Sequence, residues 1–189
     1  FISRDTKGQS ETCYLAIKDL NPNKSLFISS CDHGVLYNKE KFESLIDNKK
    51  IDIIVWGCRD YPNALRNPEM YGWINYKDNS IYEVSVKKRI KNDYCNAIII
   101  GSFFFREISL FKRLVEEQFQ KKELVNNEFY VDSLINIGIK NGLNIKYFEV
   151  DSFLCWGTPT ELKTYEYWQD CFDSWCIHKY KKKFDNDFN

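Results

Sequence analysis

The alternation of apolar and polar positions along the chain predicts a succession of strands and helices. Short apolar runs, rich in Ile, Val and Phe and bounded by polar turn residues, are typical of buried strands. Longer stretches carry apolar residues at helical spacing. The predicted strands are 25–31, 51–58, 71–76, 81–86, 96–105 and 144–150, and the predicted helices are 12–20, 39–48, 108–123, 131–142 and 158–175.

The order of these elements predicts the fold class. It begins with a strand–helix–strand unit, which favours a parallel sheet. The strands 71–76 and 81–86 are separated by the turn sequence KDNS, which predicts an inserted β-hairpin. Gly101 interrupts the strand 96–105, where a bulge or a close backbone approach is expected. We therefore predict an α/β domain with a mostly parallel mixed sheet, flanked by helices and carrying an inserted hairpin.

Composition and charge limit the classes of partner. The chain has 189 residues, of which 43% are apolar, enough for one domain with a sizeable core. Lys plus Arg and Asp plus Glu are both 27, so no global field attracts nucleic acid or an anionic membrane. Seven cysteines are scattered without the paired C-x-x-C spacing of a zinc site, which suits free thiols in a reducing cytoplasm. We expect a cytoplasmic protein without nucleic-acid or membrane partners.

The ends of the chain differ in character from its middle. The first residues, FISRDTKGQSETCYLAIKDL, read like the interior of a domain, so we expect an N-terminal part to precede them. The last residues, 176–189, are charged and polar. The expected organisation is one N-terminally incomplete domain over 1–175, followed by a charged tail.

Asp32 is the first candidate for chemistry. It follows the apolar strand 25–31, which ends in small residues. In parallel α/β sheets ligands bind beyond the carboxyl ends of strands. Mg²⁺ needs only one or two protein carboxylates in addition to phosphate oxygens. Asp32 is therefore a candidate metal ligand, and a solvated turn or helix-capping aspartate is an equally good interpretation of the pattern.

Six segments along the chain carry a family resemblance. They are TKGQSET, SSCDHG, YGWINYKDNSIYEVSVKK, NAIIIGSFFF, NNEFYVD and DSFLCWGTPTEL. In order and spacing, over roughly residues 5–170, the chain resembles the NTP-transferase family of sugar nucleotidyltransferases, of the glucose-1-phosphate thymidylyltransferase and mannose-1-phosphate guanylyltransferase type. The resemblance implies a Rossmann-like, GT-A-type fold, a Mg²⁺ cofactor, and an NTP and a phosphorylated small-molecule acceptor as partners. It also implies a role in nucleotide-sugar supply for surface polysaccharide synthesis.

The resemblance also implies roles for individual residues. Asp32 matches the metal ligand and a catalytic residue, and Lys88 the lysine that contacts the acceptor phosphate. The nucleotide would meet Gly8 and Gln9, and the acceptor would meet Gly72, Gly101 and Glu128. Asp132 opens the helix that follows. Each has a plainer interpretation: a turn or backbone accommodation for the glycines, a solvated hairpin charge for Lys88, and a helix start for the acids.

The chain departs from the family pattern in two places. Cys155 stands where the family usually has a second metal-binding aspartate, and Asp151 is the substitute that the sequence offers. The N-terminal Gly-rich loop that cradles the triphosphate is not present in these residues. The resemblance therefore covers the central and C-terminal parts of the family, and we expect these residues alone to be inactive.

Other functions stay open at this point. A cytidylyltransferase acting on a non-sugar phosphomonoester such as phosphocholine would use the same fold, and the aromatic residues of YEYW and WGTP could bind its cation. Aromatic residues on a helix, however, more often belong to a core. A GT-A-type glycosyltransferase would need a D-x-D pair, which SSCDHG lacks. A non-catalytic remnant and a homo-oligomer are both compatible with the sequence.

Overall fold

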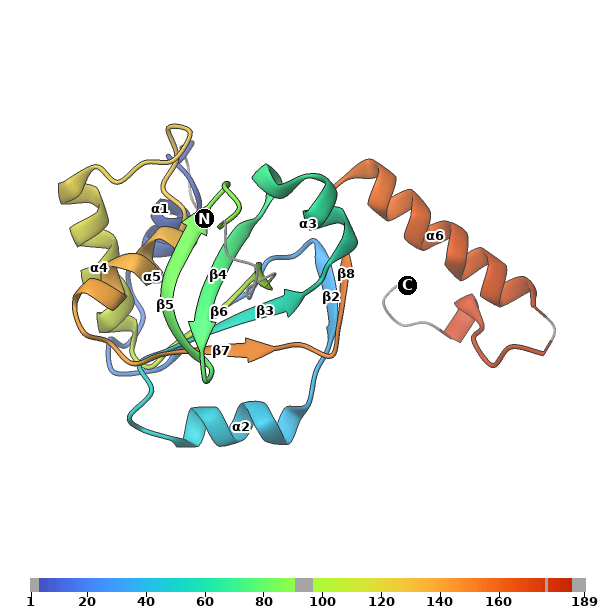
Figure 1. Ribbon diagram of the computed structural model, residues 1–189, viewed down its shortest axis with the longest axis horizontal. Coiled ribbons are helices and arrows are strands. Elements are labelled where there is room, and N and C mark those ends of the chain that lie inside the picture. Colours follow the sequence, from blue (N-terminus) through green and yellow to red (C-terminus); the bar gives the residue numbers. More distant parts are fainter. Residues whose placement is uncertain (1–3, 91–96, 176, 185–189) are drawn as a thin grey trace. The chain divides into compact units, whose positions relative to one another are not determined.

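The computed structural model describes residues 4–90, 97–175 and 177–184 (Figure 1). These residues form two compact units, a larger one of 4–30 and 36–152 and a smaller one of 31–35 and 153–184. The larger unit contains the helices α1 (Gln9–Ala16), α2 (Lys39–Asp47), α3 (Pro62–Arg66), α4 (Ile108–Lys121) and α5 (Val131–Lys140), and the 3₁₀ turn η1 (Pro68–Met70). Its strands are β1 (Leu26–Ile28), β3 (Ile53–Arg59), β4 (Gly72–Lys77), β5 (Ser80–Val86), β6 (Ala97–Phe105) and β7 (Ile145–Glu149).

The larger unit is built on one six-stranded sheet in the order β1-β6-β3-β7-β5-β4. Strand β4 also pairs with β6, so five of the strands close into a ring, with β5 and β7 joined through the pair Ser80 and Lys146. The predicted α/β class, with a central sheet and flanking helices, is confirmed. The inserted hairpin is confirmed too, and its turn residues Asp78 and Asn79 both have positive φ, as a tight hairpin turn requires.

The prediction of a mostly parallel sheet is wrong. Among the neighbouring strand pairs in the described part of this sheet, only β3–β7 is parallel. Strands β1 and β3 do run in the same direction, as the strand–helix–strand unit predicts, but β6 lies between them and pairs antiparallel with both. Apolar patterning reveals that a strand is buried but not which neighbour it pairs with, so the insertion of β6 could not be predicted.

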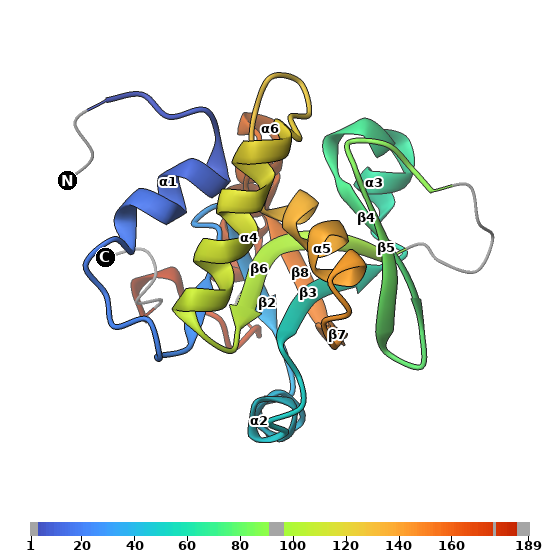
Figure 2. The ribbon, with the colours of Figure 1, turned by 90° about the vertical axis from the view of Figure 1, so that its left-hand side faces the viewer.

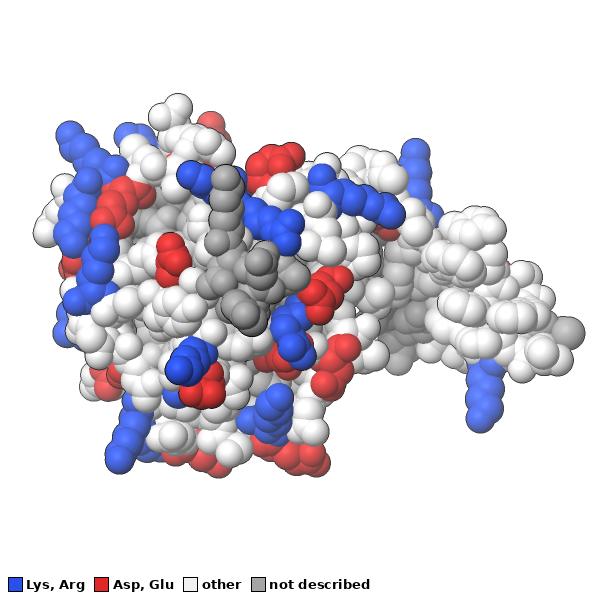
Figure 3. All heavy atoms as spheres, viewed as in Figure 1, with Lys and Arg blue, Asp and Glu red and all other residues white. Residues whose placement is uncertain are grey.

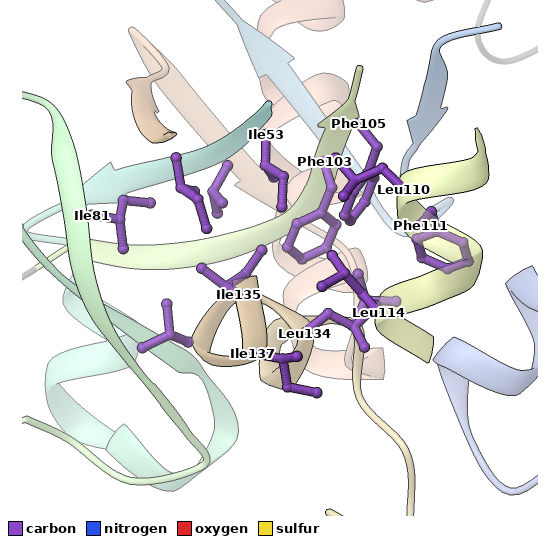
Figure 4. Packing of buried hydrophobic residues seen from close by; sticks show 14 of the residues in the cluster. Ile53, Ile81, Phe103, Phe105, Leu110, Phe111, Leu114, Leu134, Ile135 and Ile137 are labelled. Atoms are coloured by element: carbon purple, nitrogen blue, oxygen red, sulfur yellow. The ribbon is translucent and has the colours of Figure 1, made fainter. Parts of the chain in front are cut away.

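The two faces of the sheet bury different kinds of side chain. One face packs against α4 and α5, which lie side by side, and its core is dominated by Ile, Leu and Phe (Figures 2 and 4). Alternate residues of β3 and β6 point to the other face, because side-chain direction has a period of two along a strand. There Trp56 and Phe104 contact Phe42 of α2. Arg106 ties α2 to the sheet by donating to the carbonyl oxygens of Ile46, Asn48 and Ile51.

The smaller unit contains helix α6 (Pro159–Ser174) and the 3₁₀ turn η2 (Lys182–Phe184), together with most of a two-stranded sheet, β2 (His33–Leu36) and β8 (Ser152–Cys155). Neither β2 nor β8 is predicted by the apolar pattern, since both are short and partly exposed. The described part of the charged tail packs back on α6, where Lys182 pairs with Asp170 at 2.9 Å.

The helix boundaries agree with the predictions for α2, α4, α5 and α6 to within about two residues. Helix α1 is the exception, because it begins at Gln9 and ends at Ala16, whereas the pattern predicts 12–20. Leu20, which the pattern places on its buried face, is exposed. None of the helices in the described residues is long and apolar enough to cross a membrane.

Candidate functional site

The segment that starts α1 lies directly against the segment that precedes α5. The Lys7 carbonyl accepts a hydrogen bond from the amide of Phe129 at 2.7 Å, and the amide of Ser10 donates to the Phe129 carbonyl at 3.0 Å. Gly8, between them, has φ of 115°, and a Cβ there would lie 2.8 Å from the Phe129 backbone. Only glycine fits this approach. The structure therefore brings Gly8 and Gln9 together with Glu128, although these residues are far apart in the sequence.

Glu128 is presented by a tight hairpin turn. Val125 and Glu128 exchange backbone hydrogen bonds of 3.0 and 2.9 Å, and Asn126 and Asn127 between them both have positive φ. The Glu128 carboxylate is exposed and accepts a hydrogen bond from the Tyr130 phenol. Burial, reinforced by this acceptor, raises the pKa of Tyr130 to about 12. The phenol therefore stays protonated at neutral pH.

Asp132, in the first turn of α5, is packed on Gly72 at the start of β4. A Cβ on Gly72 would lie 2.2 Å from Asp132 Oδ2, which is far inside contact distance. Burial raises the pKa of the Asp132 carboxyl to about 6, while the Lys87 charge opposes that shift. A carboxylate in this position is costly to ionise, and such groups are concentrated at functional sites.

Lys87, directly after β5, holds the chain that leads into β4. Its amide donates to the carbonyl oxygen of Tyr71 at 3.1 Å, and its ammonium donates to that of Met70 at 2.7 Å. The ammonium also lies 5.6 Å from the centre of the Tyr130 ring, within cation–π range. Lys87 has φ of 56°, a left-handed conformation that costs a non-glycine residue about 1–2 kcal/mol.

The family resemblance implies that Lys88 contacts the acceptor phosphate, whereas the structure places Lys87 beside Tyr130 and Asp132. Lys88 is exposed on the hairpin exit, so its contact with an acceptor phosphate stays a prediction. The backbone at Lys87 is left-handed. Nothing in the residues KKR signals that conformation. The sequence predicts Asp132 only as a helix start, because its contact with Gly72 joins segments 60 residues apart.

Gly101 forms the predicted bulge. Strand β3 pairs Val55 with Phe103 and Gly57 with Ile99, so its register shifts around Gly101. Gly101 has φ of 80°, and its carbonyl accepts a hydrogen bond from the amide of Ser30 at 3.0 Å. Both expectations for this glycine, a bulge and a close backbone approach, are confirmed. Its contact with an acceptor stays a prediction.

In the smaller unit, Asp32 and Cys155 meet at one turn. A Cβ on Gly157 would lie 3.1 Å from Asp32 Oδ2 and 3.5 Å from Cys155 Sγ. The Asp32 carbonyl also accepts a hydrogen bond from the Trp156 amide at 2.8 Å. Helix α6 begins at the same turn with Thr158 as its N-cap, and Thr158 Oγ1 accepts a hydrogen bond from the Glu161 amide at 3.2 Å. The position that the family resemblance assigns to a second aspartate is thus indeed next to Asp32.

The donor set of this turn suits Mg²⁺ only through Asp32. Burial raises the pKa of the Cys155 thiol to about 11, and the thiol lies 3.4 Å from Glu161 Oε2. A protonated sulfur is a poor ligand for a hard cation. The described residues contain no group of three or more His, Cys, Asp or Glu side chains arranged to hold a metal. One exposed carboxylate still fits an ion that takes most of its ligands from phosphates and water.

The remaining candidates lie elsewhere. Asp151 is exposed and belongs to the larger unit, where its amide donates to the Leu36 carbonyl at 2.8 Å, and its role as a metal ligand stays a prediction. On α6, Tyr167 and Trp168 are 62% and 53% exposed. They are therefore not core residues, although aromatic residues on a helix more often are.

The face seen in Figure 3 carries interspersed positive and negative side chains, as the balanced composition predicts.

Solved structures of other proteins share this fold. A nucleoside-diphosphate-sugar pyrophosphorylase from Vibrio cholerae is 16% identical with a TM-score of 0.67, over 87% of this chain and 66% of that chain. A putative glucose-1-phosphate thymidylyltransferase from Bacillus anthracis is 18% identical with a TM-score of 0.63, over 85% and 61%. An inositol-1-phosphate CTP transferase from T. maritima is 16% identical with a TM-score of 0.57, over 85% and 60%.

These comparisons confirm, at the level of the fold, the resemblance inferred from the sequence. The chain spans between 60% and 66% of the length of these proteins. No protein-family model matches the sequence, and no curated protein matches it.

Proposed function

We propose that this protein is a nucleotidyltransferase, which transfers NMP from an NTP to a sugar-1-phosphate and releases pyrophosphate. The observation that carries the proposal is the shared fold: the two sugar-linked neighbours and the inositol-1-phosphate CTP transferase all have names that describe nucleotide chemistry at a phosphorylated small molecule. A role in nucleotide-sugar supply for surface polysaccharide synthesis is part of the same proposal.

In this proposal, individual residues contact different parts of the two substrates. Gly8 and Gln9 contact the nucleotide, and the backbone at Gly72 and Gly101, with the Glu128 carboxylate, contacts the acceptor. Lys88 is exposed at the end of the hairpin and steadies the acceptor phosphate. A phosphate dianion is already nucleophilic, so positioning and charge neutralisation suffice and no general base is needed.

Asp32 holds Mg²⁺ in this proposal, with Asp151 as the candidate second carboxylate. The bound ion supplies charge neutralisation for the phosphates. Cys155 stays protonated and hydrogen-bonded to Glu161, so its part is to shape the turn that carries Asp32.

A second acceptor class is favoured by two observations. One neighbour acts, by its name, on inositol-1-phosphate, which is not a sugar phosphate. In addition, Tyr167 and Trp168 are exposed and so are accessible to a cationic ligand. A cytidylyltransferase for a non-sugar phosphomonoester such as phosphocholine is therefore the alternative.

The test uses the complete protein, including any sequence that precedes residue 1. Pyrophosphate release is measured with CTP, dTTP, GTP, UTP and ATP against glucose-1-phosphate, mannose-1-phosphate, inositol-1-phosphate and phosphocholine. We expect turnover with one NTP and one acceptor, and a fall of about 100-fold or more in the Asp32→Asn variant, because a metal ligand is lost. The matched control is Asp19→Asn, which changes an exposed aspartate outside the site. Unchanged transfer by Asp32→Asn, or release of NDP instead of pyrophosphate, contradicts the proposal.

A further inference from the structure

We propose that Lys87 and Asp132 act together as positioning residues, which hold the segment Met70–Gly72 in the conformation that binds the acceptor phosphate compound. The inference rests on the proposed function for the identity of the ligand. The geometry of the pair is independent of that function.

Lys87 contacts this segment at two successive residues. Its ammonium donates to the carbonyl oxygen of Met70 at 2.7 Å, and its amide donates to that of Tyr71 at 3.1 Å. Gly72 follows immediately, and it pairs with Val86, the residue before Lys87. One residue thus fixes the chain from both its backbone and its side chain. Lys87 has an unfavourable left-handed backbone conformation, which persists because the surrounding contacts stabilise it.

Asp132, in the first turn of α5, packs against the same segment. Its Oδ2 occupies the space that a Cβ on Gly72 would take, with a separation of only 2.2 Å. Lys87 lies near enough for its charge to act on this carboxyl. The Met70–Gly72 segment therefore contacts both the residue that follows β5 and the first turn of α5.

The contacts distinguish Lys87 from a direct ligand. Its ammonium already donates to Met70 and faces the Tyr130 ring, whereas the neighbouring Lys88 is exposed. An ammonium committed to a backbone carbonyl stabilises the protein conformation more than it binds a diffusing phosphate. Lys88 is accordingly the matched control: the same residue type, one position further along the chain, without the positioning contacts described for Lys87.

The first experiment needs no ligand. Hydrogen–deuterium exchange is measured for the peptide covering residues 68–73 in the complete protein and in the variants Lys87→Met, Lys87→Arg, Asp132→Asn and Lys88→Met. We expect exchange to rise about tenfold in Lys87→Met and in Asp132→Asn, because a charge-assisted hydrogen bond or the partner carboxylate is lost. Lys87→Arg should restore part of the protection, and Lys88→Met should leave it unchanged. Equal exchange in Lys87→Met and Lys88→Met overturns the proposal even if every variant folds.

The second experiment uses the NTP and acceptor found in the pyrophosphate panel. Lys87→Met should raise KM for the acceptor about tenfold and leave KM for the NTP unchanged, since the segment serves only the acceptor. An equal rise in both KM values overturns the proposal, because it indicates a general structural defect.

The pH profile adds a readout that a merely structural role does not move. Among the described residues, Lys87 acts on the Asp132 carboxyl, and Glu128 acts on its neighbour Tyr130. Removing the Lys87 cation raises the pKa of Asp132, so the acid limb of kcat/KM should move to higher pH in Lys87→Met but not in Lys77→Met, which removes an exposed lysine of the hairpin outside the site. An unmoved limb overturns the coupling. If no acceptor in the panel reacts, the proposed function fails, and the exchange measurement still decides whether the pair positions Met70–Gly72.

Discussion

Two glycines of this protein each lie against an aspartate, and they differ in how much the contact constrains. In the larger unit, a Cβ on Gly72 would lie 2.2 Å from Asp132 Oδ2. In the smaller unit, a Cβ on Gly157 would lie 3.1 Å from Asp32 Oδ2. Asp132 is partly buried and its pKa is raised to about 6, whereas Asp32 is exposed. The first aspartate is confined by the fold, and the second retains room to move.

The difference suits the different tasks that we propose for the two aspartates. A confined carboxylate beside Lys87 holds the backbone in one conformation, and its position costs free energy that packing must offset. The exposed carboxylate of Asp32, on a turn, is the one proposed to hold a cation that takes its other ligands from phosphates and water. The same pair of residue types thus provides positioning in one place and a candidate metal ligand in the other.

The largest effect on this comparison is expected from Gly72→Ala. The added methyl group must displace the Asp132 carboxylate, so the free energy of unfolding should fall by about 2–3 kcal/mol, measured by urea denaturation. The double-mutant cycle with Asp132→Ala is the control, because without the carboxylate the methyl group meets mainly Ile99 at 3.3 Å. If Gly72→Ala costs the same in both backgrounds, the contact with Asp132 is not what requires glycine.

The next effect is the pH dependence of stability contributed by Asp132. Its pKa rises from 3.8 in the unfolded chain to about 6 in the fold, so the folded state binds the proton more tightly. The contribution is therefore fully present below pH 3.8 and is lost as the pH rises through 6. Urea denaturation between pH 4 and 7 measures it as the difference between the wild type and Asp132→Asn. Parallel curves for the two proteins would show that this carboxyl has an ordinary pKa.

The smallest effect is expected from Gly157→Ala. Its methyl group meets the end of the Asp32 side chain at 3.1 Å, and this end can rotate away, so the loss of stability should stay below about 1 kcal/mol. Nucleotidyl transfer should be more sensitive than stability, since Asp32 is displaced. A loss of stability as large as that of Gly72→Ala would remove the contrast between the two sites.

The sequence by itself determined the elements and several individual positions. Helical and alternating periodicities predicted α2, α4, α5, α6 and the β4–β5 hairpin. Each of these elements buries one face, so its apolar residues recur at the spacing of a helix or a strand. The bulge at Gly101 and the proximity of Cys155 to Asp32 also followed from local pattern and from the family resemblance.

Only the tertiary structure decided which strands pair and that Lys87 contacts the carbonyl oxygens of Met70 and Tyr71. Strand β6 separates β1 from β3, although its residues resemble those of any buried strand. The charge of Lys87 acts on Asp132, and Asp132 lies against Gly72 because α5 packs against β5. These features arise from contacts between segments that are far apart in the sequence. Such contacts override local propensity, so no local pattern predicts them.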